Sequence, residues 1–231
     1  MKNQDYLYLD HAASTPMRKS AMDKYIEAES YGYANSSGGH KLSRNSKNLL
    51  EDSREKIAEL LNAAQGEIVF TSGGTEADNW TIKSLFNSKR PDDNLVTSNI
   101  EHEAVIASAE WVSSNGYQTK YAKSDKNGLV TKDEFLGQVD NDTKVASLMW
   151  GNNETGIIQP IKDIAREIKT INSSTLFHSD VVQGIISDNI DFHRNGIESA
   201  AVSAHKIGGP KGVGAMSVSY THLRAHETSK H

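Results

Sequence analysis

Residues 201–216 read AVSAHKIGGPKGVGAM, and this stretch decides how the chain is expected to fold. An apolar run typical of a β-strand ends here in Ser203, His205 and Lys206. A glycine-rich turn follows, and a second apolar run occupies residues 213–216. The stretch therefore predicts buried strands joined by a turn that presents a hydroxyl, an imidazole and an amine close together.

Earlier strand-like segments also end in polar residues of the kind that bind ligands. In chain order these ends are TSGGT at 71–75, EHE at 101–103, NNE at 152–154 and HSD at 178–180, with Gln183 shortly after. In an open α/β sheet, ligands bind outside the carboxyl ends of the strands. We therefore expect all of these segments to converge on one site.

Strand-like and helix-like segments alternate along most of the chain. Strands are expected near 67–71, 95–98, 117–121, 144–150 and 175–177, and helices over 75–86, 103–112 and 161–171. The alternation predicts an α/β fold, a three-layer sandwich with a mostly parallel sheet between helices. Nearer the N-terminus we expect a short strand at 6–9, a helix from Pro16 to about residue 30, and a mobile loop over 31–46.

The composition excludes several classes of function. The chain has 231 residues, of which 36% are hydrophobic and 24% charged, a balance that suits one large globular domain. The net charge of −5 offers no basic surface for nucleic acid or for an anionic membrane. No secretory signal or membrane-spanning run is evident, so a cytoplasmic protein is expected. The sequence has no cysteine, which excludes a disulfide, a thiolate metal site or a cysteine nucleophile within it.

The turn at 71–76 is suited to an anion. It joins a predicted strand to a predicted helix, and the free N–H groups and dipole of a helix N-terminus favour negative charge. Gly74 allows a ligand to approach the backbone, and Thr75 follows it directly. The turn lacks the fingerprints of nucleotide-binding loops, so a plain tight connection is the alternative.

Other polar residues follow the remaining strands. Asp180 ends an apolar segment, where an unpaired carboxylate is costly, so it should meet a cationic partner. His102 begins a helix and is either a simple cap or a ligand contact. Asn153 and Gln183 supply neutral donors that orient a ligand, and each is otherwise a turn or capping residue.

Lys206 is either an ordinary surface lysine or a nucleophile. Near another cation and apolar walls its ammonium form is discouraged, which makes the amine nucleophilic. An amine, a buried aspartate, a flanking imidazole and a phosphate cradle together meet the needs of pyridoxal 5'-phosphate (PLP). They provide aldehyde capture, pairing with the pyridine nitrogen, ring stacking and phosphate anchoring.

Other chemistries fit the sequence less well. S-x-x-K at 203–206 and SDN at 187–189 match the penicillin-recognising pair, but their order is reversed and no K-T-G follows. The histidines fall in different local contexts and form no H-E-x-x-H pair, so no metal site is expected.

Taken together, the motifs resemble the class V aminotransferase group of fold-type I PLP enzymes, and in particular its cysteine desulfurases. The matching segments are YLDHAASTP at 8–16, TSGGTEADN at 71–79, EH at 101–102, NNETG at 152–156, HSDVVQG at 178–184 and the stretch from Ser203 through Gly214. They occur in the family's order over residues 6 to about 216.

The resemblance implies roles for the candidate residues. Lys206 would form a Schiff base with PLP, Asp180 would pair with the pyridine nitrogen, and His102 would stack on the ring; these three would be the catalytic residues. Gln183 would bond to the ring hydroxyl, and Asn153 would lie beside cofactor and substrate. The phosphate would be held by Gly74, Thr75, Ser203 and His205.

The resemblance also implies a reaction and partners. A cysteine desulfurase removes sulfur from L-cysteine, giving L-alanine and a persulfide for iron–sulfur cluster or thio-cofactor synthesis. The implied partners are a sulfur-acceptor or iron–sulfur scaffold protein and a second copy of the chain in a homodimer. A selenocysteine lyase, another class V aminotransferase and a non-catalytic PLP-binding fragment remain alternatives.

The resemblance sets an expected domain organisation. Residues 1–216 would be the large PLP-binding domain with its N-terminal segment, and residues 217–231 a disordered tail foreign to the family. Family members continue into a smaller C-terminal domain that carries the persulfide-forming cysteine and the arginine that binds the substrate carboxylate. We therefore expect a chain truncated after the cofactor lysine, which cannot form its own persulfide and is inactive in turnover.

Overall fold

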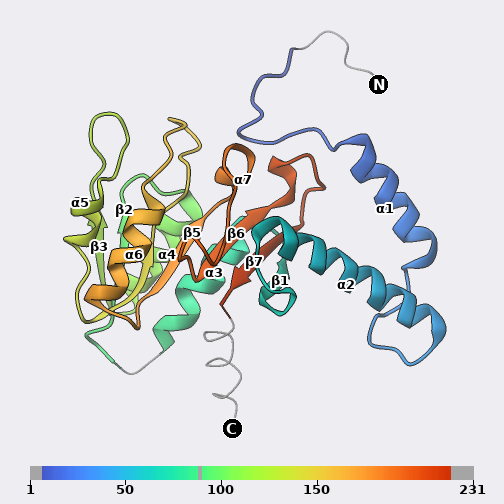
Figure 1. The fold of residues 1–231 in the computed structure, drawn as a ribbon, viewed down its shortest axis with the longest axis horizontal. Helices are drawn as coiled ribbons and strands as arrows, with labels where there is room; N and C mark the ends of the chain where they lie inside the picture. The colour runs from blue at the N-terminus through green and yellow to red at the C-terminus, as the bar shows by residue number, and fades with distance from the viewer. Residues whose placement is uncertain (1–6, 88–89, 220–231) are drawn as a thin grey trace.

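The computed structural model describes residues 7–87 and 90–219. Within these ranges the chain forms a seven-stranded sheet with helices on both of its faces (Figure 1). All of the strand pairs except those of one strand are parallel. The predicted fold class, a three-layer α/β sandwich with a mostly parallel sheet, is therefore confirmed.

The strands lie close to where the apolar runs predict them. They are β1 (Ile68–Thr71), β2 (Asn94–Ser98), β3 (Gln118–Ala122), β4 (Thr143–Ser147), β5 (Leu176–Asp180), β6 (Ser199–Ser203) and β7 (Gly214–Val218). Their order across the sheet is β1-β7-β6-β5-β4-β2-β3, and β7 runs antiparallel to both of its neighbours. Ser217 and Val218 are buried in β7, so these two residues are ordered, whereas a disordered tail was predicted to begin at residue 217.

The longer helices that follow β1 lie close to where the sequence predicts them. Those of the sandwich are α2 (Lys41–Leu61), α3 (Gly74–Ser84), α4 (Glu103–Ser114) and α6 (Ile161–Ile171), and α1 (Lys19–Tyr31) precedes them. Two short helices, α5 (Lys132–Leu136) and α7 (Gly184–Ser187), were not predicted because they are too short to show an apolar period. Short 3₁₀ turns follow at 65–67, 85–87 and 204–206.

The two faces of the sheet build separate apolar layers. Alternate strand residues point to opposite faces, so neighbours such as Leu176 and Phe177 join different clusters. Leu176 packs in the cluster that contains residues of α3 and α4, and Phe177 packs in the cluster that contains residues of α2, α5 and α6. Both faces of the central strands are therefore buried, as in a parallel sheet covered by crossover helices.

The carboxyl ends of the parallel strands meet at one edge of the sheet. Strand β7 begins at this edge, because Gly214 pairs with Thr71 at the end of β1 and with Ser203 at the end of β6. The turns that follow β1, β2, β4, β5 and β6 carry the polar residues named above. The fold thus brings the predicted segments to one place.

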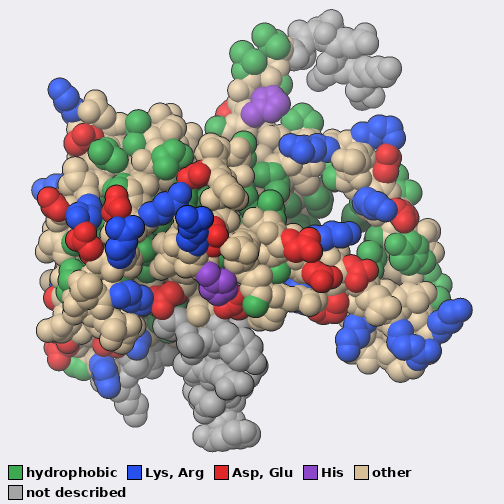
Figure 2. All heavy atoms as spheres, viewed as in Figure 1, with side chains coloured by type: hydrophobic (Ala, Val, Ile, Leu, Met, Phe, Trp, Pro, Cys, Tyr) green, Lys and Arg blue, Asp and Glu red, His purple; other side chains and the backbone are tan. Residues whose placement is uncertain are grey.

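The N-terminal arm, residues 7–40, departs from the sequence prediction. Residues 7–9 form no strand, and the side chains of Leu7 and Leu9 are 84% and 76% exposed. Helix α1 begins only at Lys19, and α2 begins at Lys41, inside the predicted loop, because the His40 ring caps it by accepting from the backbone N–H of Ser43. Figure 1 shows α1 lying apart from the sheet, and Figure 2 shows hydrophobic side chains at the surface near it.

Candidate active site

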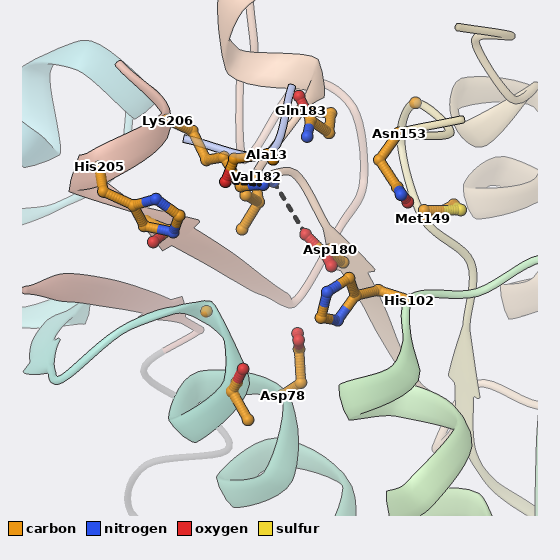
Figure 3. Close-up of a pocket in the computed structure, with 14 residues that line it drawn as sticks. Ala13, Asp78, His102, Met149, Asn153, Asp180, Val182, Gln183, His205 and Lys206 are labelled. Carbon is orange, nitrogen blue, oxygen red and sulfur yellow. Dashed lines mark hydrogen bonds between the residues drawn. The ribbon is translucent and has the colours of Figure 1, made fainter. Parts of the chain in front are cut away.

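A cavity of about 240 Å³ opens at the carboxyl edge of the sheet (Figure 3). All of the site residues predicted from the sequence line it, so the structure brings them together. They are Gly74, Thr75, His102, Asn153, Asp180, Gln183, Ser203, His205 and Lys206. The sequence did not single out the remaining lining residues, which are Ala13, Asp78, Met149, Gly151 and Val182.

Lys206 reaches the cavity from the 3₁₀ turn that follows β6. Its Nζ donates hydrogen bonds to the carbonyl oxygens of Ala12 and Ala13. Partial burial lowers the pKa of Lys206, and the charges of Asp180 and Asp10 oppose that shift. The lysine is therefore held in place with its amine made less basic than that of a surface lysine, which favours the nucleophilic form.

The N-terminal arm is fastened to the Lys206 turn by Thr15. The Thr15 backbone N–H and its hydroxyl both donate to the His205 carbonyl oxygen, at 2.9 and 2.7 Å. The same hydroxyl accepts from the backbone N–H of Gly208 at 2.8 Å. Gly208 has a φ of +81°, and a Cβ there would lie 2.5 Å from Arg18 Cγ, so this position requires glycine. The arm thus forms one wall of the cavity, a role that its sequence alone did not indicate.

Helix α3 starts directly after β1, at the predicted anion site. A Cβ on Gly74 would lie 2.8 Å from Val182 Cγ2, so the chains approach closely only because this residue is glycine. Gly74 and Thr75 open the helix, whose N-terminal N–H groups and dipole favour an anion. Ser203 and His205 line the same cavity from the end of β6 and the turn after it. The four residues carry no negative charge and provide hydroxyl, imidazole and backbone donors for a phosphate.

Asp180 lies at the end of β5 and is only 6% exposed. Its Oδ1 accepts a hydrogen bond from the backbone N–H of Val182 at 2.9 Å, drawn as a dashed line in Figure 3. Burial, and after it the charge of Asp78, raises the pKa of Asp180 to about 7, while His102 and His178 oppose the shift. A buried carboxylate of this kind is stabilised by a cationic group that enters the cavity.

His102 both caps a helix and lines the cavity. Its Nδ1 accepts from the backbone N–H of Ala104 at 3.1 Å at the start of α4, so the neutral ring carries its proton on Nε2. The ring is exposed and lies beside Asp180 in Figure 3. Capping fixes the orientation of the ring, and exposure leaves its face free for a ligand.

Gln183 and Asn153 both line the cavity. Gln183 Nε2 donates to the Ala12 carbonyl oxygen at 2.8 Å, which adds a second tie between the site and the arm. Asn153 lies in a turn organised by Asn152, whose Oδ1 accepts from the backbone N–H of Glu154 at 2.9 Å. Figure 3 shows the Asn153 amide pointing toward the cavity.

Asp78 is the ionisable residue of the cavity that the sequence analysis missed. It lies on α3, and its Oδ1 forms a 3.0 Å hydrogen bond with His178 Nε2. Both side chains are buried, with exposures of 1% and 0%. The helical spacing from Gly74 to Asp78 places both on one face of α3, a signal that the sequence contains.

Neither a metal-binding cluster nor a membrane-spanning helix is present among the described residues. Among residues 7–87 and 90–219, no group of three or more His, Cys, Asp and Glu side chains is placed to hold a metal ion. No helix within those same ranges is both long enough and apolar enough to cross a membrane.

The fold and the site together define a class of protein, an α/β enzyme scaffold with an amine, a buried carboxylate and an anion cradle at the carboxyl edge of its sheet. The sequence profile of the family described as "Aminotransferase class-V" matches residues 7–230. The chain belongs to the class-V aminotransferase family. The matched range continues past residue 216, where the family-like sequence was predicted to end.

Individual relatives within the family carry the name cysteine desulfurase. The chain is 37% identical over 211 residues to "Cysteine desulfurase IscS" of Methanosarcina thermophila, covering 91% of this chain and 52% of that protein. It is 36% identical to "Putative cysteine desulfurase IscS 1" of Bacillus subtilis, covering 91% of this chain and 55% of the relative. The chain therefore spans about half the length of the curated relatives it matches.

Solved structures agree with the sequence relatives. The structure called "NIFS-LIKE PROTEIN" matches with a TM-score of 0.89 and 35% identity, covering 92% of this chain and 58% of the other. A structure described as "SspA in complex with cysteine" matches with a TM-score of 0.87 and 33% identity, covering 92% of this chain and 61% of the other.

Proposed function

We propose that this chain is the PLP-binding part of a cysteine desulfurase, an enzyme that takes sulfur from L-cysteine. The observation that carries the proposal is the convergence of Lys206, Asp180 and the α3 anion cradle on one cavity. The relatives named cysteine desulfurase, and the similar structure described as a complex with cysteine, support the choice of substrate.

The residues of the cavity fit PLP on chemical grounds. PLP carries an aldehyde, a ring nitrogen that becomes cationic, a ring hydroxyl and a phosphate. Lys206 offers an amine for the aldehyde, and the buried Asp180 carboxylate needs the cation that the ring nitrogen provides. Gly74, Thr75, Ser203 and His205 would hold the phosphate, and Gln183 would bond to the ring hydroxyl.

The chain's own residues would divide the chemical work. When bound, PLP supplies an aldehyde that bonds to amines and a ring that withdraws electrons from the amino acid Cα. Lys206 would hold the cofactor through Nζ and take up or return a proton at that atom, which its lowered pKa favours. Asp180 would keep the proton on the ring nitrogen, His102 would cover one face of the ring and exclude water, and Asn153 would contact the substrate.

The proposed reaction needs a thiol that this sequence does not contain. The Cβ–S bond of L-cysteine breaks, and the sulfur passes to an acceptor thiol, so that cysteine and a thiol give alanine and a persulfide. The sequence has no cysteine, so the acceptor thiol comes from outside it. A sulfur-acceptor or iron–sulfur scaffold protein in the cytoplasm would fill this role, and a selenocysteine substrate would react by the same chemistry.

The absence of cysteine favours a second candidate function. In that case the described domain binds PLP, with residues 1–216 as the large domain, but does not release sulfur by itself. The exposed apolar side chains of α1 and of residues 7–9 would be covered in a homodimer or by a further domain, because surfaces of this kind mark association sites.

A spectrum tests cofactor binding and a product assay separates the two candidates. The purified chain is incubated with PLP, passed through a gel filtration column and examined for a visible band. Lys206→Ala should lose the band, whereas Lys211→Ala, at an exposed lysine in the same connection between β6 and β7, should keep it. A band retained by Lys206→Ala would contradict the assignment. With L-cysteine and dithiothreitol as acceptor, alanine and sulfide in equal amounts support the desulfurase, and their absence from a PLP-loaded sample supports the binding-only domain.

A further inference from the structure

Beneath the cavity lies a polar cluster that the proposed roles do not use. Asp78 of α3 and His178 of β5 are hydrogen-bonded through Oδ1 and Nε2 at 3.0 Å. The other ring nitrogen, His178 Nδ1, lies 3.1 Å from Ser199 Oγ on the neighbouring strand β6. Ser199 Oγ in turn lies 2.8 Å from Thr81 Oγ1. The cluster is thus a continuous chain of hydrogen bonds that runs from the cavity floor into the protein.

The cluster is completely enclosed. His178 and Ser199 are 0% exposed, Asp78 is 1% exposed and Thr81 is 4% exposed. Thr81 Oγ1 also donates to Met216 Sδ at 3.1 Å, and Met216 belongs to a buried apolar cluster. In such buried surroundings a charge is costly unless it is paired and hydrogen-bonded. The surrounding structure therefore controls whether the cluster is charged or neutral.

Two buried carboxylates face the same cavity, and ionising both of them at once is unfavourable in free energy because like charges repel. Asp78 and Asp180 line the cavity, and Asp78 points toward the region of Asp180 in Figure 3. The charge of Asp78 raises the pKa of Asp180, so ionisation of one carboxylate disfavours ionisation of the other. Asp78 differs from Asp180 in having an imidazole partner that can share a proton with it.

Other titratable groups lie near Asp78, His178 and Asp180. Glu101, before α4, is buried, and its Oε1 accepts from Ser98 Oγ and the backbone N–H of Met149. Burial raises the pKa of Glu101 well above its usual range, and the hydrogen bonds from Met149 and Ser98 oppose that shift. His102 lies beside Asp180, and Lys206 lines the same cavity. The charge on the Asp78–His178 pair acts directly on Asp180, because the charge of Asp78 raises the pKa of Asp180.

We propose that Asp78 and His178 act together as a positioning pair that retains one proton under the cavity, so that Asp180 is the carboxylate that carries the negative charge there. With the pair neutral, the charge lies on Asp180, where a cationic ring nitrogen would meet it. Asp78 would donate from its carboxyl to His178 Nε2, and His178 Nδ1–H would donate to Ser199 Oγ. These roles of Asp78, His178 and Ser199 extend the proposed function. The identity of the ligand, PLP, rests on that proposed function.

The hydrogen-bond chain also defines how the pair releases its proton. When the pair loses its proton, Asp78 becomes a carboxylate that accepts from Nε2–H, and the Nδ1 of the imidazole becomes an acceptor for the Ser199 hydroxyl. Ionisation is thus coupled to a change of the His178 tautomer. Burial raises the pKa of Asp78 to about 8 and lowers that of His178 to about 4, so the change falls on the alkaline side of neutrality.

Nuclear magnetic resonance of the full chain without PLP tests the proposal. With ¹⁵N-labelled histidine and ¹³C-labelled aspartate, the His178 ring should be in the Nδ1–H form at pH 7 and change to the Nε2–H form near pH 8. In Asp78→Asn the alkaline change should disappear. In Ser199→Ala it should move to higher pH, because the Nδ1 acceptor formed by the change then lacks a donor. Ser179→Ala is the matched control, since Ser179 is buried on β5 next to His178 but donates to the Leu148 carbonyl oxygen instead.

The outcomes separate this inference from the function proposed above. An alkaline tautomer change that needs Asp78 supports the pair whether or not the chain binds PLP. An Nε2–H ring at pH 7 with an ionised Asp78 would overturn it, as would an unchanged titration in Asp78→Asn. If a variant fails to fold, the ring form and the Asp78 carboxyl signal of the unmodified chain at pH 7 decide the question on their own.

Discussion

The sheet and the N-terminal arm are held by different kinds of interaction. Every residue of β5, β6 and β7 is buried, whereas α1 contains no buried residue. The sheet is stabilised by apolar packing on both of its faces, and the arm is joined to it near the cavity by the hydrogen bonds of Thr15, Arg18 and Gln183. The sheet therefore supplies most of the stability. The arm buries little area, and it closes one wall of the site.

The largest expected effect is in the sheet. Phe177→Ala should reduce the free energy of unfolding by about 3–5 kcal/mol, because Phe177 is fully buried and packs edge-on against Phe135. Ile26→Ala on α1, a residue that is 62% exposed, should change it by less than about 0.5 kcal/mol. Urea unfolding of both variants checks the contrast. Equal losses in the two variants would mean that the arm is packed as tightly as the core.

An intermediate effect is expected where the arm meets the site. Thr15→Val removes the hydroxyl that donates to the His205 carbonyl and accepts from the Gly208 N–H, at a cost of about 1–3 kcal/mol. PLP retention should fall as well, since the Lys206 turn loses its support. Ser30→Ala, which removes a hydroxyl within the arm but far along the chain from the turn, is the control. Unchanged PLP retention in Thr15→Val would mean that the arm does not support the cavity wall.

The smallest expected effect is a change in pH dependence. The pKa of Asp78 is raised from 3.8 to about 8, so between these values the native chain holds a proton that the unfolded chain has lost. Stability should therefore fall as the pH rises from 7 to 8, by at most about 1.4 kcal/mol per pH unit from this group. Asp78→Asn should flatten that slope in urea unfolding measured at several pH values. If the free energy of unfolding still falls with rising pH in Asp78→Asn, another titrating group is responsible for the pH dependence.

The sequence predicts the sheet well because local patterns determine most of it. Apolar runs such as 199–203 are continuous since both faces of a central strand are buried, and polar residues follow where the strands end. The site could be predicted for the same reason, because parallel strands place their carboxyl ends at one edge. Lys206 and Asp180 therefore share a cavity without any need to know the details of packing.

The arm and the buried pair could not be predicted because they depend on distant contacts. Tyr8 and Leu9 alternate like a strand, yet among the described residues the arm offers them no strand partner. The helix at Lys41 depends on the His40 cap, which composition does not reveal. Asp78 looks like an ordinary helical aspartate until β5 places His178 against it.

The most direct test of the PLP site is to find where the cofactor is attached. The chain loaded with PLP is reduced with borohydride, digested and analysed by mass spectrometry, with Lys211 and Lys19 as internal exposed controls. We predict that the reduced cofactor is found on Lys206 alone. Attachment spread over the exposed lysines, in a sample shown to be folded, would contradict the central claim that the carboxyl edge of the sheet forms a PLP site around Lys206.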